Sequence, residues 1–190
     1  MTFINKILIC IIAITLYSSC TDKDFNDQLN QAESLIDINS DSALHILDNI
    51  NLKDISAESQ KAKYILLSTH IKAKLGLALT DSTINITANY YKNHGNTKEQ
   101  VLSLLYQSNY LINKSQLDKA MLNLLQVEDL LTKFDDYYAK GYHNLLLGAI
   151  YAYYYDFKNA SVAYTHAYTH FKRLENGLLF QTLTKLLYNF

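Results

Sequence analysis

Residues 141–174, GYHNLLLGAIYAYYYDFKNASVAYTHAYTHFKRL, carry the pattern that decides the fold, because this pattern occurs twice in the chain. Residues 101–134, which lie 40 positions upstream, superimpose on them with small or apolar side chains at matching places. The matched pairs are Ser108 and Gly148, Leu111 and Tyr151, Leu117 and Phe157, Ala120 and Ala160, Leu124 and Tyr164, and Val127 and Ala167. Self-similarity at a fixed period is the signature of a repeat architecture. Each copy is therefore predicted to be one pair of helices.

The matched positions of the second copy have predicted packing roles. Gly148 and Ala160 are expected to face each other, so that the two helices of the pair approach closely. Tyr151 and Tyr164 would fill the space on either side, and Ala167 would admit the first helix of the next pair. The small residues at the corresponding places of the first copy are Ser108 and Ala120.

At these positions both copies resemble the tetratricopeptide repeat. Three further segments, Ala32–Asp48, Thr80–Ile84 and Ala88–Gly95, are similar to segments of bacterial tetratricopeptide lipoproteins. The resemblance implies an all-α fold in which antiparallel helix pairs stack into a right-handed solenoid. It also implies a concave groove, lined by the first helix of each pair, that binds a protein or peptide partner. The alternative is an unrelated helical bundle whose apolar periodicity resembles repeats.

The composition favours a helical chain. The 190 residues include no proline and five glycines, whereas turn-rich folds depend on both residue types. Helices are expected over residues 26–36, 41–49, 57–75, 81–94, 98–113, 116–133, 139–154, 157–174 and 178–190. Gly76, Gly95 and Gly177 are expected to end helices, and Thr97 with Gln100 to form a capping box. The net charge of −1 argues against a nucleic-acid partner, which would require a basic face to neutralise phosphates.

The amino terminus has the features of an export signal. Lys6 precedes ten mostly apolar residues, Ile7–Leu16, which are too few for the roughly 20 that span a bilayer but are typical of a signal peptide. Two serines then lead to Cys20, and this arrangement resembles the lipobox of bacterial lipoproteins. The resemblance implies cleavage before Cys20 and a lipid on its sulfur. The protein would then be anchored in the bacterial cell envelope, on the periplasmic or the outer-membrane and surface side. A plain secreted protein or an uncleaved anchor is the alternative.

These features divide the chain into three parts. Residues 1–19 are the predicted signal peptide, residues 20–27 an acidic tether, and residues 28–190 the helical repeat array. Residues 178–190 form either a capping helix or the first helix of a truncated further repeat. In the second case the chain would be the sensory or dimerising front of a longer envelope-linked regulator.

No catalytic or cofactor site is predicted. The sequence contains no glycine-rich phosphate loop, nucleophile elbow, HExxH motif or CxxC motif. His166 and His170 are four residues apart, a spacing that can place two imidazoles on one metal ion. No further ligand has a suitable spacing beside them, so both histidines are expected to be solvated and no metal is predicted.

The sixteen tyrosines indicate a binding surface instead. Tyr106, Asn109, Asn113, Tyr142 and Tyr153 are expected on the first-helix face that would line the groove. Amphipathic rings and amides can hold a peptide or a sugar, and a peptide is favoured because the chain has no tryptophan for stacking on a glycan. The alternative is that these tyrosines are ordinary half-buried core residues.

Overall fold

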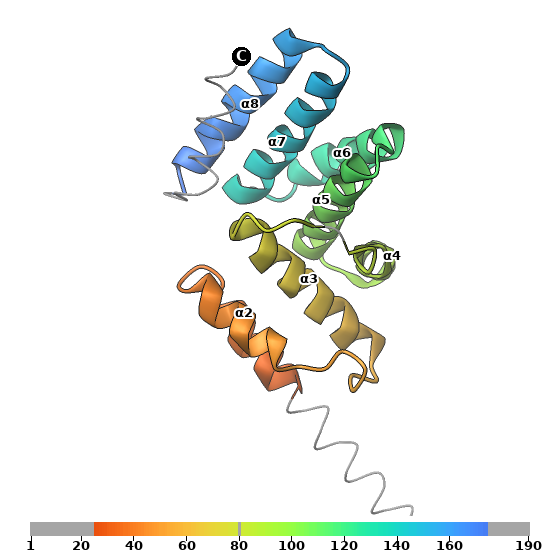
Figure 1. Cartoon of the computed structure of the whole chain (residues 1–190), viewed down its shortest axis with the longest axis vertical. Helices are drawn as coiled ribbons and strands as arrows, with labels where there is room; N and C mark the ends of the chain where they lie inside the picture. Colours follow the sequence, from red (N-terminus) through yellow and green to blue (C-terminus); the bar gives the residue numbers. More distant parts are fainter. Residues whose placement is uncertain (1–24, 80, 175–190) are drawn as a thin grey trace, which may run out of the picture.

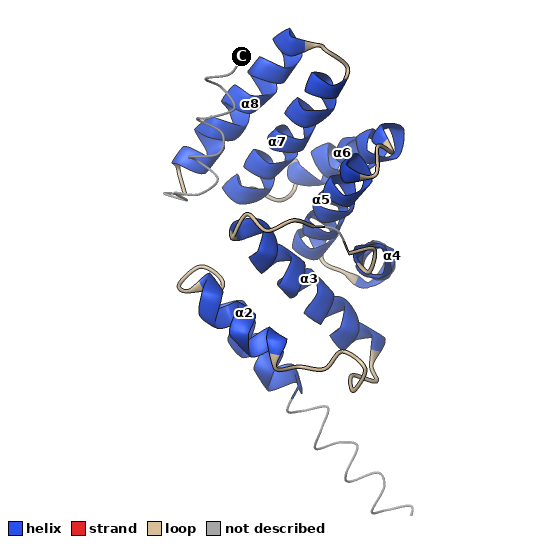
Figure 2. Ribbon diagram, viewed as in Figure 1, coloured by secondary structure: helices blue, strands red, loops and turns tan. Residues whose placement is uncertain are grey.

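The computed structural model describes residues 25–79 and 81–174, and these residues form eight α-helices with no strand among them (Figure 2). The first helix spans residues 25–35. The others, labelled in Figure 1, are α2 (Ser40–Asp48), α3 (Glu58–Lys74), α4 (Ile84–His94), α5 (Thr97–Asn113), α6 (Leu117–Leu131), α7 (Tyr137–Tyr153) and α8 (Phe157–Lys172). The all-helical prediction is confirmed, and the eight expected helices in this part of the chain are all present.

The helices stack in sequence order. From α2 onward, each helix contacts the next one along the chain, and α7 and α8 lie side by side in opposite directions (Figure 1). In addition, α3 contacts α5 and α5 contacts α7. The first helices of successive pairs therefore form one continuous layer, and this arrangement is consistent with a helical repeat solenoid.

The contact between α7 and α8 depends on two glycines. A Cβ atom added to Gly148 would lie 2.5 Å from Cδ1 and Cε1 of Tyr164, and one added to Gly141 would lie 2.6 Å from Cε1 of Phe171. Gly148 is thus a close-approach position, as the sequence predicts, but it lies against the ring of Tyr164. Ala160, which the sequence predicts to face Gly148, is fully buried, but the atoms nearest to Gly148 belong to the Tyr164 ring. A ring fits only where the opposing residue has no side chain.

The other repeat positions are buried to different degrees. Fully buried residues at these positions are Ser108, Ala120, Ala160 and Ala167, while Tyr164 is 4% exposed and Tyr151 is only partly buried against the core. The hydroxyl of Ser108 donates to the carbonyl oxygen of Leu104 at 2.7 Å, so this polar group is satisfied inside its own helix.

Two apolar clusters form the core. One joins the first helix, α2 and α3, and the other runs from α3 to α8. Helix α3 belongs to both, because it contributes Leu67 and Ile71 to the first cluster and Ile65 and Leu66 to the second. It therefore links the amino-terminal helices to the rest of the array.

Local signals set the helix ends, with small differences from the sequence prediction. The capping box of α5 is formed by Asn96 and Glu99, one residue earlier than the expected Thr97 and Gln100. Asn96 offers a side-chain oxygen that caps as well as that of threonine. Gly76 has a φ of 69° and ends α3 in the left-handed conformation that favours glycine. Gly95 ends α4 as expected, but with a φ of −88° it lies outside the left-handed conformation.

Several predictions lie outside the described residues. These are the signal peptide over 1–19, the lipidation site Cys20, the stop signal at Gly177 and the helix over 178–190. Among the helices of the described ranges, none combines the length and the apolar character needed to cross a bilayer.

Candidate functional site

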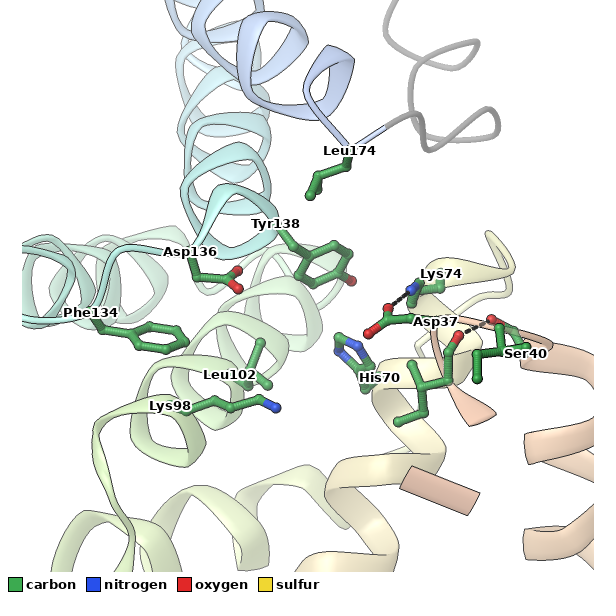
Figure 3. A pocket seen from close by; sticks show the side chains of 12 residues that line it. Asp37, Ser40, His70, Lys74, Lys98, Leu102, Phe134, Asp136, Tyr138 and Leu174 are labelled. Atoms are coloured by element: carbon green, nitrogen blue, oxygen red, sulfur yellow. Dashed lines mark hydrogen bonds and ion pairs between the residues drawn. The ribbon is translucent and has the colours of Figure 1, made fainter. Parts of the chain in front are cut away.

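A cavity of about 570 Å³ opens where the end of the first helix, α3, α5 and α7 come together (Figure 3). Its charged and polar lining residues are Asp37, Ser40, His70, Lys74, Lys98, Asp136 and Tyr138. Its apolar lining includes Leu102 and Phe134 on one wall and Leu174 above Tyr138 (Figure 3). The lining combines groups separated by more than 130 residues of chain, so the fold itself assembles this cavity.

One side of the cavity is closed by an ion pair. The ammonium of Lys74, on α3, pairs with the carboxylate of Asp37, which follows the first helix. The hydrogen bond from Lys74 lowers the pKa of Asp37 below its ordinary value, so this carboxylate stays charged. Next to it, the hydroxyl of Ser40 donates to the carbonyl oxygen of Ile36 at 2.7 Å. These contacts fix the turn that leads into α2.

Two lining residues of the cavity, His70 and Tyr138, belong to a hydrogen-bonded row across three helices. Tyr106 Oη donates to Tyr138 Oη at 3.1 Å, and His70 Nδ1 is hydrogen-bonded to Tyr106 Oη. A hydroxyl carries one hydrogen, so with the hydrogen of Tyr106 directed at Tyr138 the donor in the second bond is His70 Nδ1. The row runs from α3 through α5 to α7 and ends at the hydroxyl hydrogen of Tyr138.

Burial keeps all three members of this row uncharged. Although part of its surface is exposed, the ring of His70 is packed at centroid distances of 4.9 Å from Tyr138 and 5.9 Å from Tyr106. Burial, followed by repulsion from Lys74, lowers the pKa of His70 to about 3. Burial also raises the pKa of Tyr106 and of Tyr138 well above their ordinary values. At neutral pH, the histidine is therefore neutral and both tyrosines keep their hydrogens.

A second row joins Asn113 and Asn109 of α5 to Tyr142 of α7, and with Tyr106 beside it this row contains four of the five expected groove residues. Asn109 Nδ2 donates to Tyr142 Oη at 2.7 Å, and Asn113 Nδ2 donates to Asn109 Oδ1 at 2.9 Å. The Tyr142 ring stacks on Tyr138 at 5.7 Å and meets Tyr106 edge-on at 5.5 Å. These side chains hold the two helices together.

The two tyrosine rings of this row are buried, whereas the sequence places them on the open face of a groove. Tyr106 is 0% exposed and Tyr142 is 3% exposed, so both rings belong to the core. Because α5 packs directly onto α7, the rings of Tyr106 and Tyr142 lie between the two helices. Asn109 is half-buried and Asn113 is exposed. Tyr153 is 57% exposed, but it lies beside a separate depression at the other end of α7 and does not line the cavity.

Three of the residues that line the cavity, Lys98, Leu102 and Tyr138, were identifiable from the predicted helical stripes. On α5, positions 109, 106, 102 and 98 follow one another at helical spacing, so continuing the predicted stripe by two turns leads to Leu102 and Lys98. On α7, Tyr138 lies one turn before Tyr142. No sequence pattern pointed to three other charged and polar lining residues, His70, Lys74 and Asp37, because nothing in the sequence pairs α3 with the end of the first helix.

Lys98 differs from Lys74 in having no anionic partner. No carboxylate of the described ranges lies within 4.0 Å of its ammonium, and the side chain extends into the cavity toward His70 (Figure 3). The nearby carboxylate of Asp136 caps α7 by accepting from the amide of Ala139 at 2.7 Å. Lys98 is therefore an exposed ammonium of the cavity that forms no ion pair with a carboxylate of the described ranges.

The histidines of α8 have different surroundings. His166 is exposed, as expected. His170 is only partly exposed, and its Nδ1 is buried without a hydrogen-bond partner, which corrects the prediction that it is solvated. Burial and the neighbouring cations Lys140 and Arg173 lower its pKa. No group of three potential metal ligands occurs in the part of the chain that the structure describes.

No protein-family model, curated protein or solved structure matches this chain. A function must therefore be argued from the cavity, its charges and its hydrogen bonds.

Proposed function

We propose that this chain is a non-catalytic scaffold of tetratricopeptide type, anchored to a bacterial membrane through a lipid on Cys20, that binds a segment of a protein partner. The observation that carries the proposal is the cavity of about 570 Å³ on the layer formed by α3, α5 and α7. Binding sites of helical arrays lie on such a continuous inner layer, where several repeats can contact one ligand.

The chemistry of the cavity supports a peptide ligand. The wall formed by Leu102 and Phe134 offers apolar surface, while Lys98 and the hydroxyl of Tyr138 offer hydrogen-bond donors. A peptide presents both apolar side chains and oxygen acceptors, and sites of this kind combine an apolar lining with a few placed polar groups.

The state of the cavity residues supports a binding role over catalysis. His70 has a pKa of about 3, well below the range in which a general base is effective near neutral pH. The Ser40 hydroxyl donates to Ile36 O, so its hydrogen is directed at the backbone, and no hydrogen bond joins Ser40 to His70. The nucleophile and base of a hydrolytic site would be hydrogen-bonded to each other.

Two exposed isoleucines provide a test with a matched control. Ile38 is 80% exposed and lines the cavity, whereas Ile86 is 58% exposed on α4 and lies outside it. With tagged full-length protein purified from its native membranes, Ile38→Arg is expected to remove a co-purifying protein that both the Ile86→Arg variant and the unaltered chain retain. Equal recovery by the two variants would contradict binding at the cavity.

A second candidate, glycan binding, is favoured by one feature. Tyr153 and Tyr154 are 57% and 56% exposed, and they border a depression of about 370 Å³ with Gln116, Asp118 and Lys119. Exposed rings beside polar side chains can hold a sugar ring and its hydroxyl groups. A glycan array probed with the unaltered chain and with Tyr153→Ala would separate this function from peptide binding, because Tyr153 lies outside the cavity.

A further inference from the structure

We propose that Lys98 and Tyr138 together bind one carboxylate, contributed by an acidic side chain of the partner segment. This inference rests on the proposed function, and it specifies the chemistry that the cavity selects. It is carried by two hydrogen-bond donors that belong to the lining of the same cavity (Figure 3) and for which the described residues supply no acceptor.

The first donor is the hydroxyl hydrogen of Tyr138. Tyr138 is 7% exposed, and its oxygen already accepts from Tyr106 at 3.1 Å. Because Tyr106 in turn accepts from His70, the three groups form a chain of donors that ends at the hydroxyl hydrogen of Tyr138. No acceptor for the last hydrogen occurs in residues 25–79 or 81–174. Each bond in such a chain polarises the next, so Tyr138 is a strengthened donor.

The second donor is the ammonium of Lys98. The other cavity lysine, Lys74, is already paired with Asp37, and Asp136 is engaged at the amino end of α7. Lys98 is consequently the cavity cation whose charge a ligand can neutralise. A carboxylate accepts from an ammonium and a hydroxyl at once, and charge-assisted bonds of this kind are stronger than neutral ones.

The remaining lining favours a side-chain carboxylate over a chain terminus. Leu102 and Phe134 lie beside Lys98 and can cover the methylene groups of an aspartate or glutamate side chain (Figure 3). The carboxylates of Asp37 and Asp136 also face the cavity, and they would repel a second negative charge. A single acidic side chain within a longer segment matches both features.

Matched peptide sets test this inference directly. Amidated 12-residue peptides with one central glutamate, the same peptides with glutamine, and the glutamine peptides with an unblocked carboxyl terminus are arrayed and probed with the full-length protein. We expect glutamate peptides to bind about tenfold more tightly than their glutamine counterparts, as the loss of a charge-assisted bond predicts. Lys98→Gln and Tyr138→Phe should each remove this preference.

Lys158→Gln is the matched control variant. Lys158 is the second residue of α8, as Lys98 is of α5, so both substitutions remove one charge at the same helical position, and Lys158 lies outside the cavity. It should keep the preference for glutamate. Tyr138→Phe keeps the ring and its stacking, and unchanged circular dichroism would show that the fold is retained.

The outcomes separate the two proposals. Equal binding of glutamate and glutamine peptides would overturn this inference and leave peptide binding at the cavity intact. Binding that depends on the unblocked terminus would overturn the assignment to a side chain. If Lys158→Gln removed the preference for glutamate peptides as fully as Lys98→Gln does, the preference would be a non-specific charge effect. Failure of every peptide to bind would contradict both the inference and the proposed function.

Discussion

The ring of Tyr164 lies directly against the backbone of Gly148, so closely that a Cβ at position 148 would be 2.5 Å from two ring carbons. Seven residues further along each helix in opposite directions, Gly141 and Phe171 repeat the same relationship. A spacing of seven residues returns to the same face of a helix. The antiparallel helices α7 and α8 therefore approach closely at two places, and at each a glycine of α7 contacts an aromatic ring of α8.

This relationship predicts the effect of a single methyl group. Gly148→Ala should destabilise the protein by about 1–3 kcal/mol, because the ring or the helices must shift to admit the new atom. The loss would be measured by urea unfolding followed by circular dichroism. In a Tyr164→Leu background, Gly148→Ala should lower the free energy of unfolding by less than it does in the unaltered chain. An alanine that costs as much beside leucine as beside tyrosine would contradict this packing.

The capping box of α5 gives a prediction that distinguishes the observed cap, Asn96 with Glu99, from the expected cap one residue later, Thr97 with Gln100. Asn96→Ala should cost about 1 kcal/mol, because the amide of Glu99 loses its side-chain acceptor. Thr97→Ala should have a much smaller effect, since Thr97 is the first residue inside the helix. Thermal unfolding of both variants checks this, and a larger loss for Thr97→Ala would favour the register one residue later.

The buried position of His70 predicts a pH dependence of stability. Its pKa is about 3 in the folded protein and 6.5 as its ordinary value, so between these limits the unfolded chain binds a proton that the folded chain does not. Stability should therefore be unaffected by this group above pH 6.5 and should fall as the pH is lowered toward 3. Between pH 7 and pH 5 the loss should be about 2 kcal/mol.

A His70→Gln variant isolates this contribution from the other charges around it. Asp37, Lys74 and Lys98 all act on His70, and Asp37 itself loses its pairing with Lys74 at lower pH. Glutamine retains a donor for Tyr106 but does not titrate. Urea unfolding at pH 7 and pH 5 should show a smaller loss for His70→Gln than for the unaltered chain. The same loss in both proteins would show that His70 is not held neutral.

The central residue of the His70 row, Tyr106, makes a fourth stability prediction. Tyr106→Phe should cost about 1–3 kcal/mol, because it leaves both His70 Nδ1 and Tyr138 Oη without their buried partner. Tyr110→Phe is a suitable control on the same helix, since Tyr110 is only partly buried. Unfolding in guanidinium chloride compares the two variants, and equal losses would contradict the importance of the row.

Helix positions were predictable from this sequence because each depends on local signals. The absence of proline, the apolar periodicity and the two copies at 101–134 and 141–174 act within one or two helices. All eight helices in the described ranges were expected within three residues of their observed ends. The capping box was misplaced by one residue because Asn96 and Thr97 are both good capping residues.

The candidate site was only partly predictable, because it depends on how one helix lies on another. The stripe containing Tyr106 and Asn109 was identified, but the sequence does not reveal that α7 covers it and leaves only its amino-terminal end, at Lys98, facing the cavity. The pairing of Asp37 with Lys74 joins two segments through tertiary packing alone. Contacts of this kind have no signature in a single sequence.

Site-specific photo-crosslinking tests the central claim, that a partner occupies the cavity, most directly. Benzoylphenylalanine would replace Phe134, which lines the cavity, or Phe157, which is 52% exposed at the start of α8 and lies outside it. Both substitutions exchange one aromatic side chain for another in the full chain. We predict that a partner is crosslinked from position 134 but not from position 157. Ile38→Arg should abolish the crosslink from position 134. Crosslinking of the same partner from both positions, or from neither, would contradict the central claim.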